Sequence, residues 1–385
     1  MKRSLLILAA LLLVVGFVVP AGPEVEAAGA NGEYIPGEII VKFKPEVPKL
    51  KASAAHHAID AQVKSKNEEI GFQVVKVKDR SVEDALKQYR NNPNVEYAEP
   101  NIVFHTAAQP NDPDFSKQWG LEKVKAPAAW DVTTGSGNVK VAIVDTGVDY
   151  GHEDLSGKVE KGGDYIENDG DPMDENGHGT HCAGIAAATT DNGVGIAGMA
   201  PDVTIYAVRV LDANGSGSLQ SVADGIIDAA DAGAEVISLS LGASRGAQTL
   251  ENAVNYAHDK GSAVVAAAGN NGSSSPSYPA YYDNALAVGA TDSNDNKASF
   301  SNYGRWVDVA APGVDIYSTY IGGGYQSLSG TSMATPHVAG LAGLLASQGK
   351  NNTQIRSTIE NTADSVSGTG TDWIHGRINA EKAVN

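Results

Sequence analysis

Short, strongly apolar runs alternate with helical segments between residues 139 and 362, and this alternation restricts the possible folds more than any other feature of the sequence. The apolar runs cover residues 139–144, 205–211, 236–241, 263–268, 285–288 and 307–311. Helical spacing is found at residues 178–188, 221–232, 249–260, 332–347 and 353–362. Strands without a polar face are typical of parallel sheets that helices cover on both sides. The sequence therefore predicts a three-layer α/β fold with a mainly parallel central sheet, whose functional site lies at the carboxyl ends of the strands.

The first 28 residues have the layout of a secretory signal peptide. Lys2 and Arg3 precede an apolar run at residues 5–19, and small residues follow near Ala27 and Ala28. A membrane anchor is the alternative, but the run is short for a bilayer and no later segment resembles it. We therefore expect export from the cell, with residues 1–28 removed.

Residues 29–106 predict a separate small α+β domain of ferredoxin-like type. Strands are expected at residues 38–43, 72–77, 95–97 and 102–104, and a helix at 81–91 with Ser81 as its N-cap. A polar connection with two prolines follows at residues 106–114, which is typical of a domain boundary and of a cleavable site. The larger α/β domain then occupies residues 107–385.

Charge and cysteine content limit the possible partners. Acidic and basic residues balance in residues 1–106, so the formal net charge of −18 falls entirely in residues 107–385. Such an acidic domain is not expected to bind nucleic acid or an anionic membrane. Cys182 is the only cysteine, which excludes an intramolecular disulfide and leaves the core and bound ions to stabilise the domain.

Three motifs carry residues with catalytic chemistry. They read AIVDTGV at residues 142–148 with Asp145, NGHGTHCAG at 176–184 with His178, and GTSMATPHVAG at 330–340 with Ser332. A serine nucleophile needs a base to take its proton and an acid to orient that base. Taken singly, the aspartate is equally well a turn or helix cap, and the glycine-rich histidine segment a tight turn. The three motifs together favour a catalytic triad.

The motifs and their order, Asp, His, Ser, resemble those of the subtilisin family of serine proteases, most closely its thermitase-like members, over residues 111–384. The resemblance implies a serine endopeptidase in which Asp145 is the acid, His178 the base and Ser332 the nucleophile. It also implies that His181 and His337 are packing residues. The domain at residues 29–106 similarly resembles the inhibitory, self-cleaved propeptide of subtilisin-like zymogens.

Asn270 follows the apolar run at 263–268 in the sequence AAAGN. An asparagine after glycine is more often a turn residue, but the resemblance implies that its amide, with the Ser332 N–H, stabilises the oxyanion. An extended polypeptide substrate is expected to lie between two glycine-containing segments. The resemblance assigns the substrate contacts to Gly215, Ser216, Gly217, Ser240, Leu241, Gly242, Ala267, Ala268, Gly269 and Ser277. Ser277 and the neighbouring Asn271 are uncharged, so we expect a preference for apolar or aromatic residues before the cleaved bond.

Residues 164–175 contain six acids and no lysine or arginine. A solvated acidic loop is one explanation, and a bound Ca²⁺, which takes six to eight oxygen ligands, is the other. The resemblance implies a site formed by Asp164, Glu167, Asp169, Asp171 and the Met173 carbonyl. It implies a tighter second site formed by Asp112, Asp154, Asn192 and the carbonyls of Thr189, Val194 and Ile196. A weak third site for Na⁺ or Ca²⁺ would use the carbonyls of Ala280, Tyr282 and Ala285 with Asp308.

The sequence favours a broad-specificity endopeptidase that acts as a monomer on polypeptides. Two other functions are alternatives. A non-catalytic, calcium-stabilised binding protein is disfavoured because all three triad residues and Asn270 are present. An esterase or lipase is expected to carry a Gly-x-Ser-x-Gly elbow, and the segment GTSMA at residues 330–334 lacks its last glycine.

Overall fold

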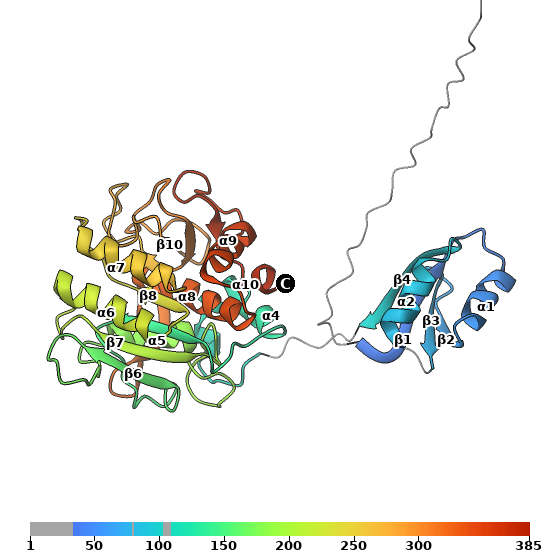
Figure 1. Cartoon of the computed structure of the whole chain (residues 1–385), viewed down its shortest axis with the longest axis horizontal. Helices are drawn as coiled ribbons and strands as arrows, with labels where there is room; N and C mark the ends of the chain where they lie inside the picture. The colour runs from blue at the N-terminus through green and yellow to red at the C-terminus, as the bar shows by residue number, and fades with distance from the viewer. Residues whose placement is uncertain (1–33, 79–80, 103–108) are drawn as a thin grey trace, which may run out of the picture. The chain divides into compact units, whose positions relative to one another are not determined.

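The structure is a computed structural model that describes residues 34–78, 81–102 and 109–385. The described residues form two compact units, one within residues 34–102 and one within residues 109–385 (Figure 1). The expected signal peptide lies outside the described residues, as do part of the expected strand at 102–104 and the first residues of the connection at 106–114.

The N-terminal unit is a four-stranded antiparallel sheet with two helices, arranged in the order βαββαβ. Its sheet order is β2-β3-β1-β4, which is the ferredoxin-like arrangement. The elements are β1 (Tyr34–Phe43), α1 (Lys49–His57), β2 (Ala61–Lys66), β3 (Phe72–Val77), α2 (Val82–Arg90) and β4 (Val95–Ile102).

Helix α2 begins and packs as its sequence predicts. The Ser81 hydroxyl accepts a hydrogen bond from the Asp84 N–H at 3.1 Å, which satisfies one of the free donors of the first turn. The side chains of Ala85, Leu86 and Tyr89 are buried in the core of this unit together with Ile39 and Val75.

The C-terminal unit has an eight-stranded sheet in the order β14-β11-β10-β9-β8-β5-β7-β6, and every pair of neighbours is parallel. The strands are β5 (Lys140–Asp145), β6 (Val159–Asp164), β7 (Thr204–Arg209), β8 (Val236–Leu239), β9 (Ala263–Ala267), β10 (Ala285–Thr291), β11 (Val309–Pro312) and β14 (Gly376–Arg377). The predicted mainly parallel sheet is confirmed.

Helices cover both faces of this sheet (Figure 1). Residues of β5 alternate between the two layers: Val141 and Ile143 pack with helices α5 (His178–Ala187) and α8 (Thr331–Ser347). Ala142 and Val144 pack on the other face with α6 (Leu219–Asp231) and α7 (Gln248–Asp259). Because successive side chains of a strand point to opposite faces, a wholly apolar strand supplies two cores.

The remaining elements complete the edges of the unit. They are the 3₁₀ helix η1 (Phe115–Lys117), the short helices α3 (Trp119–Lys123) and α4 (Ala126–Trp130), the hairpin of β12 (Ile316–Tyr320) and β13 (Gly324–Leu328), α9 (Asn352–Thr362) and α10 (Ala380–Val384). In the described part of the chain, no helix has both the length and the apolar character needed to cross a bilayer.

The sequence did not predict strand β6, which reads VEKGGD and lies at the sheet edge. An edge strand buries little side-chain surface, so its sequence carries no apolar run. Helix α6 starts at Leu219 instead of Ser221. Ser218 and Ser221 each accept a hydrogen bond from the other's N–H, so the cap lies two residues earlier than the first apolar residues indicate.

Candidate active site

The three motif residues come from different elements that end or begin at the carboxyl edge of the sheet. Asp145 is the last residue of β5, His178 is the first residue of α5, and Ser332 is the second residue of α8. His178 Nδ1 donates to Asp145 Oδ1 at 2.7 Å, and the Thr146 N–H donates to the same oxygen at 2.7 Å. This geometry fixes one tautomer of His178, with Nε2 left as the acceptor.

The environment of His178 favours a stronger base. Burial by itself lowers the pKa of His178, but the charge of Asp145 and its hydrogen bond outweigh burial, so the pKa lies above its ordinary value. Asp145 is fully buried, and its Oδ2 has no hydrogen-bond partner among the described residues. A buried carboxylate of this kind interacts strongly with the one cation that can form beside it, the imidazolium.

The Ser332 hydroxyl donates to the carbonyl of Ser240 at 3.0 Å. The carbonyl of Ser332 accepts hydrogen bonds from Ser240 Oγ at 2.8 Å and from Cys182 Sγ at 3.4 Å. Because Ser240 follows β8 and Cys182 belongs to α5, these bonds hold the start of α8 against both elements.

Asp174 positions the start of α5, a role that the sequence did not reveal. Its buried carboxylate accepts from Thr146 Oγ1 at 2.8 Å, from the Asn176 and Gly177 N–H groups at 2.9 Å, and from Thr180 N and Oγ1 at 2.9 and 2.6 Å. One side chain therefore ties the loop after β5 to the first turn of the helix that carries the histidine. Because Asp174 lies in the acidic stretch, the sequence suggested an ion ligand and not a cap. An acidic residue shortly before the start of a helix was the signal that could have indicated the capping role.

Asn270 follows β9 and is oriented by Thr331, which the sequence analysis also missed. The Thr331 N–H and hydroxyl both donate to Asn270 Oδ1, at 2.8 and 2.9 Å. The amide NH₂ of Asn270 is thus the free end of an exposed side chain, beside the start of α8. A donor held in this way is suited to an oxyanion next to Ser332.

A cleft of about 720 Å³ runs along this edge of the sheet and includes His178 in its wall. Six of the expected substrate residues line it: Gly215, Ser216, Gly217, Ser240, Leu241 and Gly242. Four others, Ala267, Ala268, Gly269 and Ser277, do not. The structure therefore brings the segments 215–217 and 240–242 to the lining of one cleft.

Gly269 and Ser277 instead lie close to Gly242. A Cβ atom at Gly242 would lie 2.8 Å from Ser277 Oγ, and one at Gly269 would lie 3.3 Å from the same atom. The backbone at Gly269 has a φ of +98°, which favours glycine. Ala267 and Ala268 are buried at the end of β9.

Three of the predicted ligands in the acidic stretch converge. One carboxylate oxygen each from Asp164, Glu167 and Asp169 lie within 4.8 Å of one another, with Asp164 buried and the other two exposed. This donor set fits a hard cation such as Ca²⁺. A positively charged side chain also lies near residues 164–175. Arg209 of β7 lies 3.7 Å from Glu167 and 2.7 Å from Glu175.

Asp171 does not join this cluster of side chains. Asp171 accepts from Tyr150 Oη at 2.9 and 3.1 Å and from Lys161 Nζ at 3.2 Å, and these bonds hold the pKa of its carboxyl below the ordinary value. The Met173 carbonyl faces Gly147, where a Cβ would come within 2.9 Å of it. The strand β6, which was not predicted, carries the lysine that engages Asp171.

The second predicted calcium site contains two buried carboxylates. Asp154 Oδ1 accepts from Asn192 Nδ2 at 2.9 Å, and Asp154 Oδ2 accepts from the Ile196 N–H at 2.9 Å. Asp112 accepts from the N–H groups of Asp191 and Asn192. Burial, with the charges of Asp191 and Asp154 adding to it, raises the pKa of Asp112. Two buried carboxylates that bond the same loop fit a cation that neutralises them. The other expected ligands, the carbonyls of Thr189, Val194 and Ile196, belong to that loop, which follows α5.

At the third predicted site a guanidinium already bonds two of the four expected ligands, Asp308 and the carbonyl of Ala285. Arg356 Nη2 donates to Asp308 Oδ1 at 3.0 Å, and Nη1 donates to the carbonyls of Ala285 at 3.1 Å and Asp283 at 2.7 Å. The other oxygen of Asp308 accepts from the Ala287 N–H at 2.7 Å. The remaining expected ligands, the carbonyls of Ala280 and Tyr282, lie in the same loop before β10. Arg356 comes from α9, far along the chain, so the local sequence could not show it.

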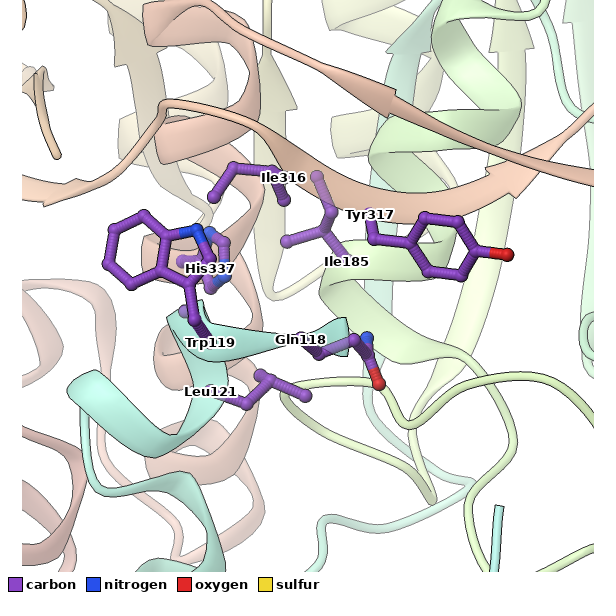
Figure 2. Close-up of a pocket in the computed structure, with 8 residues that line it drawn as sticks. Gln118, Trp119, Leu121, Ile185, Ile316, Tyr317 and His337 are labelled. Carbon is purple, nitrogen blue, oxygen red and sulfur yellow. The ribbon is translucent and has the colours of Figure 1, made fainter. Parts of the chain in front are cut away.

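The two other motif histidines are packing residues in the structure. His337 belongs to α8 and lines a small hollow together with Trp119, Leu121 and Ile185 (Figure 2). Its Nδ1 donates to the Met333 carbonyl at 2.9 Å, and burial lowers its pKa to about 4. His181 Nε2 donates to the Gln326 carbonyl at 2.9 Å, and burial likewise lowers the pKa of His181 to about 4.

Cys182 lies one helical turn after His178 and is fully buried. Its Sγ is within 4.8 Å of a ring nitrogen of His178 and a carboxylate oxygen of Asp145. Burial, reinforced by the negative charge of Asp145, raises the pKa of the Cys182 thiol well above its ordinary value. The thiol is therefore a neutral packing group directly behind the histidine.

The chain is similar to known proteins over nearly its whole length. Residues 136–377 match the Subtilase family, and residues 20–101 match the fervidolysin N-terminal prodomain. A thermophilic serine proteinase of Bacillus sp. (strain AK1) is 57% identical over 94% of this chain and 90% of its own length. Thermitase of Thermoactinomyces vulgaris is 64% identical over 71% of this chain and 99% of its own.

A solved structure gives the same result. A protease from Pseudoalteromonas arctica, 34% identical, superposes with a TM-score of 0.67 over 72% of this chain and 99% of its own. The fold and the enzyme class that the sequence predicted are thereby confirmed. The chain belongs to the subtilase family, as a subtilisin-type serine endopeptidase with an N-terminal prodomain.

Proposed function

We propose that this protein is a secreted, calcium-stabilised endopeptidase of broad specificity that processes its own precursor. The observation that carries the proposal is the 2.7 Å bond from His178 to a fully buried Asp145, at the sheet edge where Ser332 and Asn270 also lie. Residues 1–28 are the proposed signal peptide, 29–106 the propeptide and 107–385 the mature enzyme.

In the proposed mechanism His178 Nε2 takes the proton of the Ser332 hydroxyl, which must first turn away from the Ser240 carbonyl. Ser332 Oγ attacks the substrate carbonyl, and the bond between carbonyl carbon and amide nitrogen breaks as His178 protonates the leaving amine. The acyl-enzyme is then hydrolysed by water, with His178 again accepting a proton. Asp145 stabilises the imidazolium in both steps.

Charge develops on the substrate oxygen in each tetrahedral intermediate. The free NH₂ of Asn270 and the N–H of Ser332 are the proposed donors to that oxygen. Because Thr331 already holds the Asn270 amide, this side chain does not have to reorient during the reaction.

Substrate is proposed to bind as an extended strand between the segments 215–217 and 240–242, antiparallel to the second. Both segments line the cleft and are rich in residues without bulky side chains, which lets a peptide backbone approach. We call the residue whose carbonyl is attacked P1, and the residues before it P2, P3 and so on. The uncharged Ser277 supports an apolar or aromatic P1 residue.

Calcium is proposed to bind at two places, through Asp164, Glu167 and Asp169 at the first and through Asp112, Asp154 and Asn192 at the second. The bound ions would neutralise these carboxylates and fix the loops that hold them. The first loop leads directly to Asp174, which holds the start of the helix bearing His178.

The N-terminal domain is proposed to inhibit the enzyme and to be removed by a cut between residues 106 and 111. Its support is the match to a protease prodomain over residues 20–101. The purified full-length Ser332→Ala variant should fold, remain unprocessed and release no nitroaniline from a peptide nitroanilide. The wild-type precursor should yield a mature protein that a sulfonyl fluoride inactivates. A mature-length product from the purified variant, measured by mass spectrometry, would disprove self-processing.

A further inference from the structure

The cleft has a charge pattern opposite to that of the domain around it. The chain has a formal net charge of −18, carried by residues 107–385, yet none of the twenty described residues that line the cleft is acidic. Arg245 is the one lining residue with a permanent positive charge. An exposed cation in a groove free of acids is an available partner for a negatively charged ligand.

Arg245 is not bonded to any carboxylate of the described residues. Within the described residues it is exposed and forms no ion pair, in contrast to Arg209 and Arg356, which are both bonded to carboxylates. A guanidinium presents several N–H donors that match a carboxylate, and it stays charged at every pH at which the enzyme would work.

The position of Arg245 along the cleft follows from the bonds of the neighbouring segment. Ser332 Oγ lies 3.0 Å from the Ser240 carbonyl, so P1 lies beside Ser240. In an antiparallel pairing P3 then lies opposite Gly242. The pairing ends there, because Ala243 uses its N–H and carbonyl to bond Tyr278, at 2.8 and 2.9 Å.

Beyond Gly242 the cleft wall continues through Ala243, Arg245, Gly246 and Ala247 to Leu250. A substrate advances by about 3.3 Å per residue, so the next positions to pass this wall are P4 to P6. Leu241 and Leu250 give this part of the lining apolar side chains, and the exposed Arg245 gives it a positive charge.

We propose that Arg245 makes this protease favour polypeptides with an acidic side chain four to six residues before the cleaved bond. This inference rests on the proposed function, since it concerns the substrate of the same cleft. The chemistry recognised is a carboxylate, supplied by aspartate or glutamate of an extended, acidic polypeptide. Such a substrate would otherwise be repelled by the enzyme's own net charge.

The test uses the mature enzyme and quenched peptides that share one sequence from P4 to the leaving side and carry Glu, Gln or Lys at P5. The wild type is expected to cleave the Glu peptide with a kcat/KM about three- to fivefold above that of the Lys peptide, as for an exposed ion pair. The ratio should fall when NaCl is raised at constant calcium. Arg245→Gln should bring the ratio to about one, and Arg245→Glu should invert it.

Arg305→Glu is the matched control, because Arg305 is also exposed but does not line the cleft, and the change in net charge is the same. It should leave the Glu-to-Lys ratio unaltered. A ratio of one in the wild type, or an equal shift in both charge-reversal variants, would overturn the inference, the latter showing general steering by net charge. If the wild type cleaves none of the peptides while the Ser332→Ala variant behaves identically, the proposed function itself fails.

Discussion

Thr331 donates both its backbone N–H and its hydroxyl to the side-chain oxygen of Asn270, at 2.8 and 2.9 Å. The same hydroxyl accepts from the Gly269 N–H at 3.1 Å, so one threonine joins the loop after β9 to the start of α8. With both of these donors on Oδ1, the NH₂ of Asn270 remains as the proposed donor to the substrate. Thr331, the residue before the proposed nucleophile, is therefore a positioning residue for the proposed oxyanion donor.

Replacing Thr331 by valine tests this relationship. Valine keeps the shape and the backbone donor but removes the hydroxyl, so Asn270 is held less firmly. We expect kcat to fall by about tenfold, or about 1.4 kcal/mol of activation free energy, with KM little changed. Asn270→Leu should cost about 10²–10³-fold in kcat. Thr331→Ser, which restores the hydroxyl, should recover most of the activity; equal losses in Ser and Val variants would contradict the role of the hydrogen bond.

The pH dependence of activity should reflect the pair Asp145 and His178. The base must be neutral, so kcat/KM rises with pH through the pKa of His178. Asp145 raises that pKa, so the acid limb is expected above the ordinary histidine value of 6.5. Asp145→Asn should lower kcat by about 10⁴-fold and move the limb to lower pH, as measured from a pH–rate profile. A limb that stays in place in this variant would show that Asp145 does not set the pKa.

Removal of calcium should lower both the thermal midpoint and the activity. Asp164, Glu167 and Asp169 repel one another, and Arg209, 3.9 Å from Asp164 and 3.7 Å from Glu167, offsets this only in part. A ligand that binds only the native state stabilises it by about 4 kcal/mol at 1,000 times its dissociation constant. The chelated enzyme should also lose activity irreversibly through self-digestion.

Two variants separate the cluster from its neighbour. Asp169→Asn should weaken the response of the midpoint to added calcium. Asp171→Asn should weaken it much less, because Asp171 is bonded to Tyr150 and Lys161 instead of joining the cluster. Equal responses in calorimetric titrations of the two variants, or no effect of a chelator on the wild type, would exclude this calcium site.

Cys182 predicts inhibition by mercurials. Its buried thiol lies within 4.8 Å of both Asp145 and His178, so a metal attached to sulfur must displace the histidine. Reaction should be slow, because burial raises the pKa of the thiol and keeps it neutral. Cys182→Ser should retain activity and resist the mercurial, and inhibition that persists in this variant would place the target elsewhere.

Acid should destabilise the C-terminal unit through its buried histidines. His181 and His337 are neutral in the native state down to a pKa of about 4, whereas an unfolded histidine protonates near 6.5. The unfolded state therefore binds more protons below pH 6.5, and stability is lost as pH falls from 6.5 to about 4. Each histidine contributes at most about 3 kcal/mol to this loss.

The measurement is best made in the Ser332→Ala background, where self-digestion is absent. The additional change His337→Gln should reduce the dependence of the thermal midpoint on pH between 6.5 and 4. The change His258→Gln, at a half-exposed histidine of α7, is the control and should leave that dependence unaltered. If the midpoint shows the same pH dependence with and without His337, this histidine is not the source of acid sensitivity.

The sequence by itself determined the apolar strands of the sheet and the motif residues, but not the edge strands β6 and β14. Apolar strands and helix caps are local signals, because a strand buried on both faces needs apolar residues at every position and a cap needs one hydroxyl at one place. The predicted strands and helices of the C-terminal unit therefore match the structure to within a few residues. The positions of Asp145, His178 and Ser332 at the ends of their elements also follow from local sequence.

Only the tertiary structure decided how the remaining polar groups are used. Asp171 is paired by a lysine of a polar edge strand, and Asp308 by an arginine of a distant helix, although both had been expected to bind ions. Asp174 holds the start of α5 for a similar reason. A carboxylate offers the same oxygens to a cation, a guanidinium or a backbone N–H, so its role depends on which of these the fold brings within 3 Å. That choice is made by contacts between residues far apart in the chain, which no local pattern records.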